Sequence, residues 1–595
     1  MCRILFEATG EVVSKYYIIV IRGGGPMRVY EAVVKGLESI GVTAGFGGAG
    51  ENDASLMLAL KHAKTMRPVI TRHEQAASFM ACGHAMYTDQ LGFCFATAGP
   101  GAFNLFSGLA VAMSDSYPVL AISGFSALAW KGKGALNETS GFGRTPDSQA
   151  MFAATTKGSF LLTDIAETCE VLEEAVNLAF EGRPGPVHIH IPEDLTHPGQ
   201  SVNNYRDLRL KAAPVMPDPV RVCDTAAALA DALTKQKKVL ALIGFGVIRS
   251  RAESELAALL ECWSIPFVTT LDGKGAITDD SPLSVGLFTD SGQNEAWKAF
   301  IDADVVLAIG NAFAQHATFN FRPDLLDGKT LIHINISAEE IDKVYKADHA
   351  IIADAKLALD ALFVELTRLG PPKGDWRPAR HDYAKDHIMH LDGHIHPGQL
   401  IQALSARLPA DAFVLADAGA HAAWAGFYLK LTGGQRFRKP GGFGPMAGHI
   451  NGAIGLKCAF PDRPVIVVCG DGGYGLAGFE LMTAVQYDLP VIWIIFNDSE
   501  FKLIKIFQIS AYGESGLTDF QNPDWAAYAA ACGAVGRNVD SLGDFEAALE
   551  AALASGKPTV INAHITRLAL PHYSPSPHGV LAGFGEMIGE RLHPS

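Results

Sequence analysis

The sequence is poor in the features that mark secreted, membrane-spanning or zinc-stabilised proteins. Its nine cysteines are scattered over 595 residues and form no Cys-x-x-Cys pair. A disulfide framework or structural zinc site is therefore not expected, and a reducing cytoplasm fits this cysteine usage best. No apolar run reaches the ~18 residues of a membrane-spanning helix, and the charges within residues 1–10 are unlike the apolar core of a signal peptide.

Positive charge is also scarce. The chain has 48 Lys and Arg against 63 Asp and Glu, which gives a net charge of −15. An acidic chain has no general attraction for nucleic acid or for an anionic membrane, so we expect neither as a partner. Any phosphate group that it binds must be held locally, by backbone N–H groups or by a metal ion.

Short apolar segments alternate with amphipathic helical stretches along the whole chain, starting with a predicted helix over 29–40. The predicted strands are 68–70, 119–122, 187–191, 239–243, 305–309, 465–468 and 491–496. This alternation is typical of βαβ units, and the chain is too long for one hydrophobic core. We therefore predict an α/β fold with three doubly wound parallel-sheet domains.

Two polar, proline-rich stretches divide the chain and are predicted to be linkers. They cover 195–219 and the region that starts at 369–376. The resulting domains are 27–195, 215–368 and 385–565. Residues 1–26 are expected to form a loosely packed extension, and 566–595 a tail that ends in a short helix.

The strongest local pattern lies at 465–498. An apolar strand runs into Gly470, Asp471, Gly472 and Gly473, a helix is predicted over 479–486, and a second apolar strand ends before Asp498. A glycine-rich turn and a helix start offer N–H groups to a diphosphate. If the two strands are neighbours, Asp471 and Asp498 face the same cleft. Two carboxylates, a main-chain carbonyl and diphosphate oxygens suit Mg²⁺.

A lone Gly-Asp-Gly is usually no more than a strand-to-helix turn, but the complete unit is specific. It resembles the signature of the thiamine diphosphate (ThDP) enzymes, within them the acetolactate synthase, pyruvate oxidase and benzaldehyde lyase group. The resemblance implies that Gly470, Gly472 and Gly473 hold the ThDP diphosphate. It also implies that Mg²⁺ binds Asp471, Asp498 and the main-chain carbonyl of Glu500.

The first domain carries a second resemblance to the same family. The segment around Glu74 (VITRHEQAASF) resembles the one whose glutamate binds and activates the aminopyrimidine ring. By itself, a glutamate in the first turn of a helix is usually a charge placed against the helix dipole. The 98–104 segment resembles the family's GPGxxN turn, which adds Gly99 and Asn104 to the expected cofactor site. Segments 115–124 and 183–192 extend the resemblance across the domain.

In the third domain, 441–448 resembles the segment that bends the cofactor. Met446 would lie between its two rings and the carbonyl of Gly444 would accept the 4′-amino proton, although a methionine alone is normally core filler. The 417–424 segment resembles the family's DxGxHxxW, which places Gly419 and His421 beside the diphosphate or the substrate. A histidine alone is as readily a structural group.

The central domain resembles one that often holds FAD or ADP, through 239–251 and 273–275. The GSRFDDR-type segment of FAD-binding relatives is replaced by 310–316, which has no arginine. We therefore predict that no FAD is bound, while ADP or the nucleotide part of CoA remains open.

Three functions are open at this stage. The first is a ThDP-dependent decarboxylase or carboligase acting on 2-oxo acids; the second is an acyloin or 2-hydroxyacyl-CoA lyase. The third is a non-catalytic cofactor-binding subunit, against which Glu74, Asp471 and Met446 argue. The substrate is left open because Gly143-Arg144-Thr145 replaces the FQE segment of acetolactate synthases. Arg144 could pair with a substrate carboxylate or be an ordinary exposed arginine. The family's shared site implies a homodimer or homotetramer.

Overall fold

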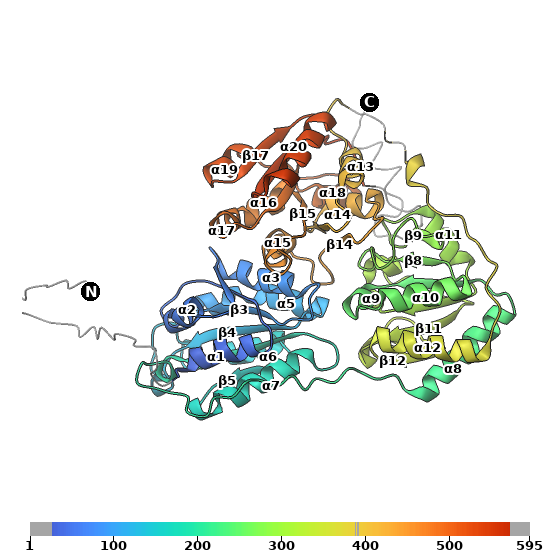
Figure 1. Ribbon diagram of the computed structural model, residues 1–595. Helices are drawn as coiled ribbons and strands as arrows, with labels where there is room; N and C mark the ends of the chain where they lie inside the picture. The colour runs from blue at the N-terminus through green and yellow to red at the C-terminus, as the bar shows by residue number, and fades with distance from the viewer. Residues whose placement is uncertain (1–26, 387, 389–391, 572–595) are drawn as a thin grey trace, which may run out of the picture.

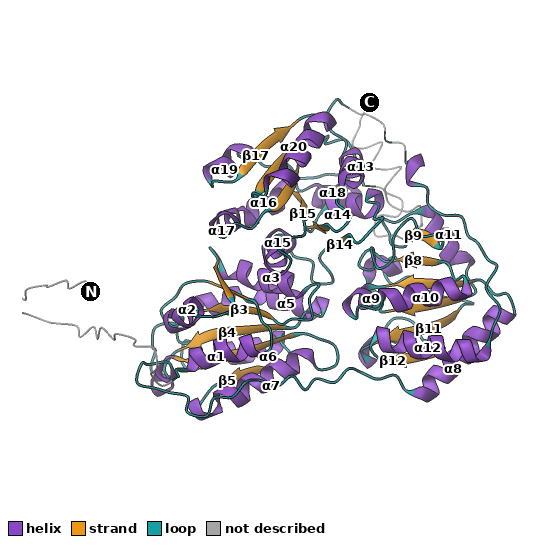
Figure 2. Ribbon diagram, viewed as in Figure 1, coloured by secondary structure: helices purple, strands orange, loops and turns teal. Residues whose placement is uncertain are grey.

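The computed structural model describes residues 27–386, 388 and 392–571, which fold into three α/β units (Figure 1). Each unit is built on a six-stranded sheet in which every neighbouring pair of strands is parallel. Helices cover the sheets in all three units (Figure 2). The predicted fold class is confirmed, and the sheets lie within 27–195, 215–368 and 385–565. The domain boundaries themselves stay a prediction.

The first unit contains Glu74 at the start of a helix. Its sheet has the order β2 (Arg67–Ile70), β1 (Ala44–Gly47), β3 (Gly92–Ala96), β4 (Val119–Phe125), β6 (Pro186–Pro192) and β5 (Ser159–Leu161). Its helices are α1 (Val29–Ser39), α2 (Ala54–Lys61), α3 (Glu74–Ala85), α4 (Pro100–Asn104), α5 (Phe106–Asp115), α6 (Ser148–Thr155) and α7 (Thr168–Phe180). Strands β4 and β6 are buried throughout, as strands covered on both faces are.

The central unit repeats this design. Its sheet has the order β12 (His349–Ile352), β11 (Thr330–Asn335), β10 (Val305–Ile309), β7 (Val239–Ile243), β8 (Phe267–Thr269) and β9 (Ser284–Leu287). Its helices are α8 (Pro219–Thr234), α9 (Phe245–Arg249), α10 (Glu253–Trp263), α11 (Asn294–Asp302) and α12 (Ala355–Leu369). Asp218 and Asp354 start α8 and α12 by accepting hydrogen bonds from first-turn N–H groups.

The third unit carries the Gly-Asp-Gly pattern. Its sheet has the order β14 (Arg436–Arg438), β13 (Phe413–Ala416), β15 (Val465–Gly470), β16 (Val491–Asn497), β18 (Thr559–His564) and β17 (Val535–Val539). Its helices are α13 (Pro397–Arg407), α14 (Ala420–Tyr428), α15 (Gly448–Ala459), α16 (Asp471–Ala477), α17 (Leu481–Gln486), α18 (Lys502–Tyr512), α19 (Trp525–Ala531) and α20 (Leu542–Ser555).

One local prediction in this unit was wrong. A helix was expected only from 479, after a glycine-rich turn, but α16 begins at Asp471 itself. A short 3-10 turn, η7 (Gly478–Glu480), then joins α16 to α17. The glycines made the segment read as a turn, yet burial of α16 against the sheet outweighs the low intrinsic helix propensity of glycine.

The strand order places the candidate residues at special points of the sheets. In the first sheet β1 lies between β2 and β3, and in the third β13 lies between β14 and β15. The chain therefore leaves β1 and β3, or β13 and β15, in opposite directions, which opens a crevice at the carboxyl ends of these strands. The segments that follow β1 and β3 surround Glu74, and those that follow β13 and β15 carry Gly419 and Asp471.

The first and third units meet along α3 and α15, which lie side by side at the centre of Figure 1. A Cβ atom at Gly83 would lie 1.9 Å from the carbonyl oxygen of Gly452, and one at Gly455 would lie 1.8 Å from that of Met80. Only glycine permits so close an approach of two helix backbones. The order of these contacts makes the two helices antiparallel.

The segments between the units are irregular, as predicted: 196–218 has no helix or strand, and 370–396 has only a 3-10 turn within its described part. The predicted extension over 1–26 and the helix in the tail lie outside the described residues. In the part of the chain that is described, every helix is too short or too polar to cross a membrane.

Candidate active site

Glu74 is held at the start of α3 by the loop after β1 and by α4. The Nδ2 atom of Asn104 donates to Glu74 Oε2 at 2.9 Å. Cβ atoms at Gly48 and Gly101 would approach Glu74 Oε1 to 2.9 and 3.2 Å. The segments after β1 and β3 thus close around the carboxylate, and Oε1 has no hydrogen-bond partner among the described residues. Asn104 contacts Glu74 in this structure, and its expected contact with the cofactor stays a prediction.

The turn at Gly99 brings a further loop to this place. Gly99 has a φ of 66°, a conformation that favours glycine, and its α carbon faces Asn137. Asn137 belongs to the 131–149 loop, which folds around Glu138, whose carboxylate accepts hydrogen bonds from the N–H groups of Gly134 and Ala135 at 2.8 and 3.0 Å. The loop expected near the site therefore lies beside it, with Arg144 exposed.

In the third unit, a cavity of about 290 Å³ brings the predicted residues together. Those on its wall are Gly419, His421, Gly444, Met446, Gly470, Asp471, Gly472, Gly473, Asp498 and Glu500. Every candidate that the sequence placed in this unit therefore lines one cavity. Strands β15 and β16 pair in register up to Gly470 and Phe496, so the two aspartates do lie at the same sheet edge.

The aspartates carry negative charge that the protein does not fully neutralise. Burial raises the pKa of Asp471, although Asn522 and backbone N–H groups favour its ionised form. Burial, together with the charges of Asp471 and Glu500, raises the pKa of Asp498 to about 7. The Nζ atom of Lys502 lies 3.5 Å from Asp498 Oδ2 and acts in the opposite direction. A buried pair of carboxylates with raised pKa values suits a cation between them.

The fit to a magnesium diphosphate depends on oxygen ligands beyond side chains. Within the described residues there is no group of three or more His, Cys, Asp or Glu side chains that could hold a metal by itself. The side chain of Glu500 is bound by Lys505 and Arg567, at 2.7 and 2.8 Å. Only its main-chain carbonyl, which also accepts from Lys502 N at 2.9 Å, is left for the metal.

Two residues that support this cavity had not been singled out. Asn522 donates to Asp471 Oδ2 at 2.7 Å and to Asn497 Oδ1 at 3.0 Å. It lies in an irregular loop with no pattern that could have marked it. Asp417 accepts from Ala447 N and His449 N at 2.8 and 3.1 Å and so ties β13 to the start of α15. Its motif had pointed to Gly419 and His421 instead.

His421 is a neutral, fixed group. Burial lowers its pKa to about 4, and its Nε2–H donates to the carbonyl oxygen of Asp417 at 2.8 Å. The other ring nitrogen, Nδ1, faces Gly470, where an added Cβ would come within 3.4 Å. His421 is thus positioned as a hydrogen-bond acceptor on the wall of the cavity, not as a cation.

The two halves of the predicted site lie at opposite ends of the α3–α15 pair. Glu74 starts α3, whereas the 440–448 segment packs against Gly83 and Met86 near its end. About 13 Å of helix separates Glu74 from Gly83. Within one chain, therefore, Glu74 is separated along α3 from the segment that contains Met446.

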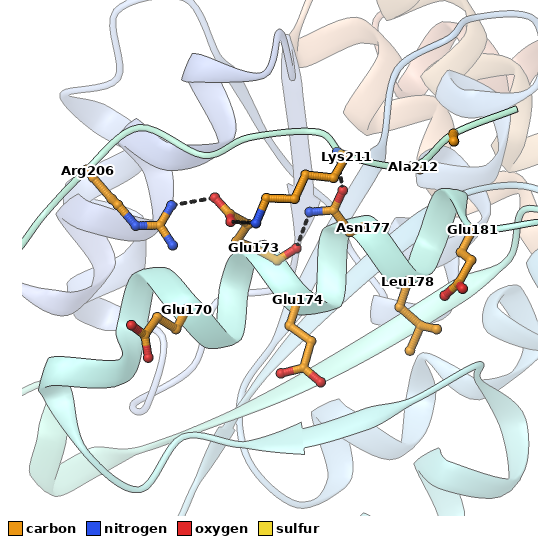
Figure 3. A pocket seen from close by; sticks show the side chains of 10 residues that line it. Glu170, Glu173, Glu174, Asn177, Leu178, Glu181, Arg206, Lys211 and Ala212 are labelled. Atoms are coloured by element: carbon orange, nitrogen blue, oxygen red, sulfur yellow. Dashed lines mark hydrogen bonds and ion pairs between the residues drawn. The ribbon is translucent and has the colours of Figure 1, made fainter.

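A larger hollow, of about 680 Å³, lies elsewhere along α7 and the segment that follows β6 (Figure 3). Its central carboxylate, Glu173, is already bound by Arg206, by Lys211 at 2.7 Å and by Arg209 N at 2.9 Å. These hydrogen bonds, that of Arg206 first, lower the pKa of Glu173 to about 2. The hollow contains none of the predicted site residues. It is a surface groove whose central carboxylate already has its hydrogen-bond partners.

In the central unit, the backbone segments after β7 and β10 are in contact. Gly246 N donates to Gly310 O at 3.0 Å, and a Cβ at Gly244 would lie 2.2 Å from the same oxygen. The chain segments after β7 and β10 thus touch where a nucleotide would enter. The absence of FAD, and a place for ADP or CoA, stay predictions.

Comparison with known proteins agrees with this geometry. Models of the thiamine pyrophosphate enzymes match in three parts: the N-terminal TPP binding domain at 27–149, the central domain at 226–362 and the C-terminal TPP binding domain at 417–563. The probable acetolactate synthase large subunit of Methanocaldococcus jannaschii is 31% identical over 554 residues, covering 90% of this chain and 91% of that protein.

Two bacterial relatives are similarly related. The acetolactate synthase isozyme 2 large subunit of Escherichia coli is 31% identical, over 84% of this chain and 89% of its own. The acetolactate synthase large subunit of Parasynechococcus marenigrum is 32% identical, over 84% and 81%. The chain therefore belongs to the thiamine pyrophosphate enzymes, in the family of the acetolactate synthase large subunits.

Proposed function

We propose that this ThDP-dependent enzyme takes a 2-oxo acid, releases its carboxylate as CO₂ and joins the remaining acyl carbon to the carbonyl carbon of a second substrate, giving a 2-hydroxy ketone. The observation that carries this proposal is the single cavity that collects the glycines, Met446, Asp471 and Asp498. Glu74, fixed by Asn104, supplies the complementary carboxylate. The relatives' name, acetolactate synthase, makes a 2-oxo acid the first substrate class to test.

Each residue of the site would have its own role in this reaction. Bound ThDP supplies an electron sink for the bond that breaks and the bond that forms. Glu74 holds and moves a proton at the aminopyrimidine N1′, through the Oε1 atom that Asn104 leaves free. Gly444 and Met446 would contact the rings of the cofactor, and Asp471 and Asp498 would hold its diphosphate together with a cation. His421 accepts a hydrogen bond at the cavity wall.

A complete site would need two copies of the chain, arranged as a homodimer or a homotetramer. The separation of Glu74 from Met446 along α3 supports this, because one aminopyrimidine ring must touch both. Ile504 on the cavity wall is more than half exposed in the single chain, as are Phe443, next to Gly444, and Leu476 and Phe479, which follow Gly473 in α16 and η7. Exposed apolar groups of this size are typical of a surface that a partner covers.

Product analysis tests the reaction. Purified protein with ThDP and Mg²⁺ is given a panel of 2-oxo acids, acyloins and 2-hydroxyacyl-CoAs. We expect one CO₂ per 2-hydroxy ketone formed, with acetolactate as the first product to seek. Cleavage of an acyloin or a 2-hydroxyacyl-CoA without CO₂ would establish the lyase alternative, and no CO₂ from any 2-oxo acid would contradict the proposal.

Mg²⁺ is expected to be required for ThDP to bind. With metal, ThDP at a hundredfold excess over its Kd should stabilise the fold by about 2.7 kcal/mol, seen as a rise in Tm; after chelation the rise should vanish. Asp498→Ala should abolish it, whereas Asp498→Asn should keep part of it because an amide oxygen can still bind the metal.

Asp519→Asn is the matched control. Asp519 contacts Lys505 and Arg567 near the cavity but is not on its wall, so the ThDP-dependent rise in Tm should be unchanged. An equal rise with and without metal would exclude the Mg²⁺ site.

A further inference from the structure

A carboxylate from the third unit reaches the backbone that leads into Glu74. Glu480, in η7, is 3% exposed. Its Oε1 atom accepts hydrogen bonds from Arg72 N at 2.9 Å and from His73 N at 3.0 Å. Its Oε2 atom accepts from Thr483 Oγ1 at 2.6 Å, which fixes the carboxylate from the other side.

These two N–H groups lie directly before α3, where no carbonyl of the helix can accept them. His73 is the residue before the first turn, and its ring accepts from Gln75 N. Glu480 therefore completes the start of α3 from another unit, and its negative charge lies at the positive end of the helix dipole. Burial raises the pKa of Glu480, while the N–H groups of Arg72 and His73 favour its ionised form.

Glu74 is thereby held from two sides. Asn104 fixes one oxygen of its side chain, and Glu480 fixes the two peptide groups that precede it. Without Glu480, the N–H groups of Arg72 and His73 lose their acceptor, and the side chains of Arg72 and His73, both exposed, offer no apolar packing to replace it.

We propose that Glu480 is a positioning residue for Glu74: by accepting from Arg72 N and His73 N it sets where the Glu74 carboxylate stands. The inference rests on the proposed role of Glu74 in activating ThDP. It differs from a general packing role, because it predicts that the acceptor geometry of residue 480 matters more than its charge.

Four variants separate these possibilities. Glu480→Gln keeps an Oε1 atom that can accept both N–H groups, with an amide that can donate to Thr483. Glu480→Asp keeps the charge but is one methylene shorter. Glu480→Ala removes the acceptor. Tyr487→Phe is the matched control. Tyr487 OH also accepts a backbone N–H of the first unit, that of Ile70 at 2.9 Å, but this group lies at the end of β2 and not directly before Glu74.

The readouts are kcat, the KM for ThDP, Tm, and the circular dichroism of the aminopyrimidine ring in the bound cofactor, recorded without substrate. A misplacement of about 1 Å costs roughly 10²-fold, so Glu480→Ala should lower kcat about 10²-fold and weaken the dichroic signal. The KM for ThDP should change little, because the diphosphate cavity is untouched. We expect kcat to be highest for Glu480→Gln, within a few-fold of wild type, lower for Glu480→Asp and lowest for Glu480→Ala.

Tyr487→Phe should lower Tm and leave kcat and the dichroic signal near wild type. The inference would be overturned by equal kcat values for Glu480→Ala and Tyr487→Phe, or by a higher kcat for Glu480→Asp than for Glu480→Gln. If the Ala variant does not fold, the Asp and Gln order still decides. An active Glu74→Gln would instead refute the proposed function, which separates the two failures.

Discussion

Glu74→Gln is expected to lower kcat by roughly 10³-fold, within the range of about 10²–10⁴ that a positioned acid or base contributes. Glutamine has the same shape, and its oxygen can still accept from Asn104 Nδ2. It cannot hold or release a proton at the aminopyrimidine N1′. ThDP affinity, measured by the ligand-dependent rise in Tm, should remain near wild type because the diphosphate binds elsewhere.

Glu51→Gln is the matched control for this variant. Glu51 is an exposed glutamate in the loop between Gly48, which lies beside Glu74, and α2. Its kcat should stay at the wild-type value. Full activity of Glu74→Gln, with product formation measured as above, would refute the mechanism.

Mixing two inactive variants is expected to restore activity. Glu74→Gln and Asp471→Asn should each be nearly inactive alone. In a hybrid dimer with two-fold symmetry, one site combines both defects and the other combines an intact Glu74 with an intact Asp471. Random pairing of equal amounts makes half of the dimers hybrid, so about a quarter of wild-type activity should return.

Two differently tagged chains, co-expressed and purified through both tags, give the hybrid alone, for which about half of wild-type activity is expected. A hybrid of two chains that both carry Glu74→Gln is the control and should stay inactive. No recovery in the mixed hybrid would show that each site lies within one chain, in conflict with the placement of Glu74 and Met446 at opposite ends of the α3–α15 pair.

The site in the third unit could be predicted from the sequence because its residues follow the ends of neighbouring strands. Gly470–Gly473 follow one apolar strand and Asp498 follows the next, and strand neighbours in a parallel sheet share an edge. The structure confirmed that pairing, with β15 beside β16. The helix start at Asp471 was missed, because glycine-rich sequence favours a turn unless tertiary packing opposes it.

Residues that support the site by holding other residues could not be predicted from the sequence. Glu480 is an ordinary glutamate after a phenylalanine, and Asn522 lies in a loop without periodicity. Their partners, Arg72, His73 and Asp471, are 408, 407 and 51 positions away. Such contacts leave no trace in local spacing. That of Glu480 depends on how the first and third units dock, and that of Asn522 on how a distant loop folds back within the third unit.

The sequence by itself determined the α/β class, its alternating strands and helices, and the grouping of the diphosphate and metal candidates, because burial pattern and strand-end position are local properties. Only the tertiary structure decided that Glu74 and Met446 lie at opposite ends of one helix pair. The reason is the glycine contact of α3 with α15. Cβ atoms added at Gly83 and Gly455 would lie 1.9 and 1.8 Å from carbonyl oxygens of the facing helix, so the antiparallel packing depends on glycines that are far apart in the sequence, and no short segment specifies it.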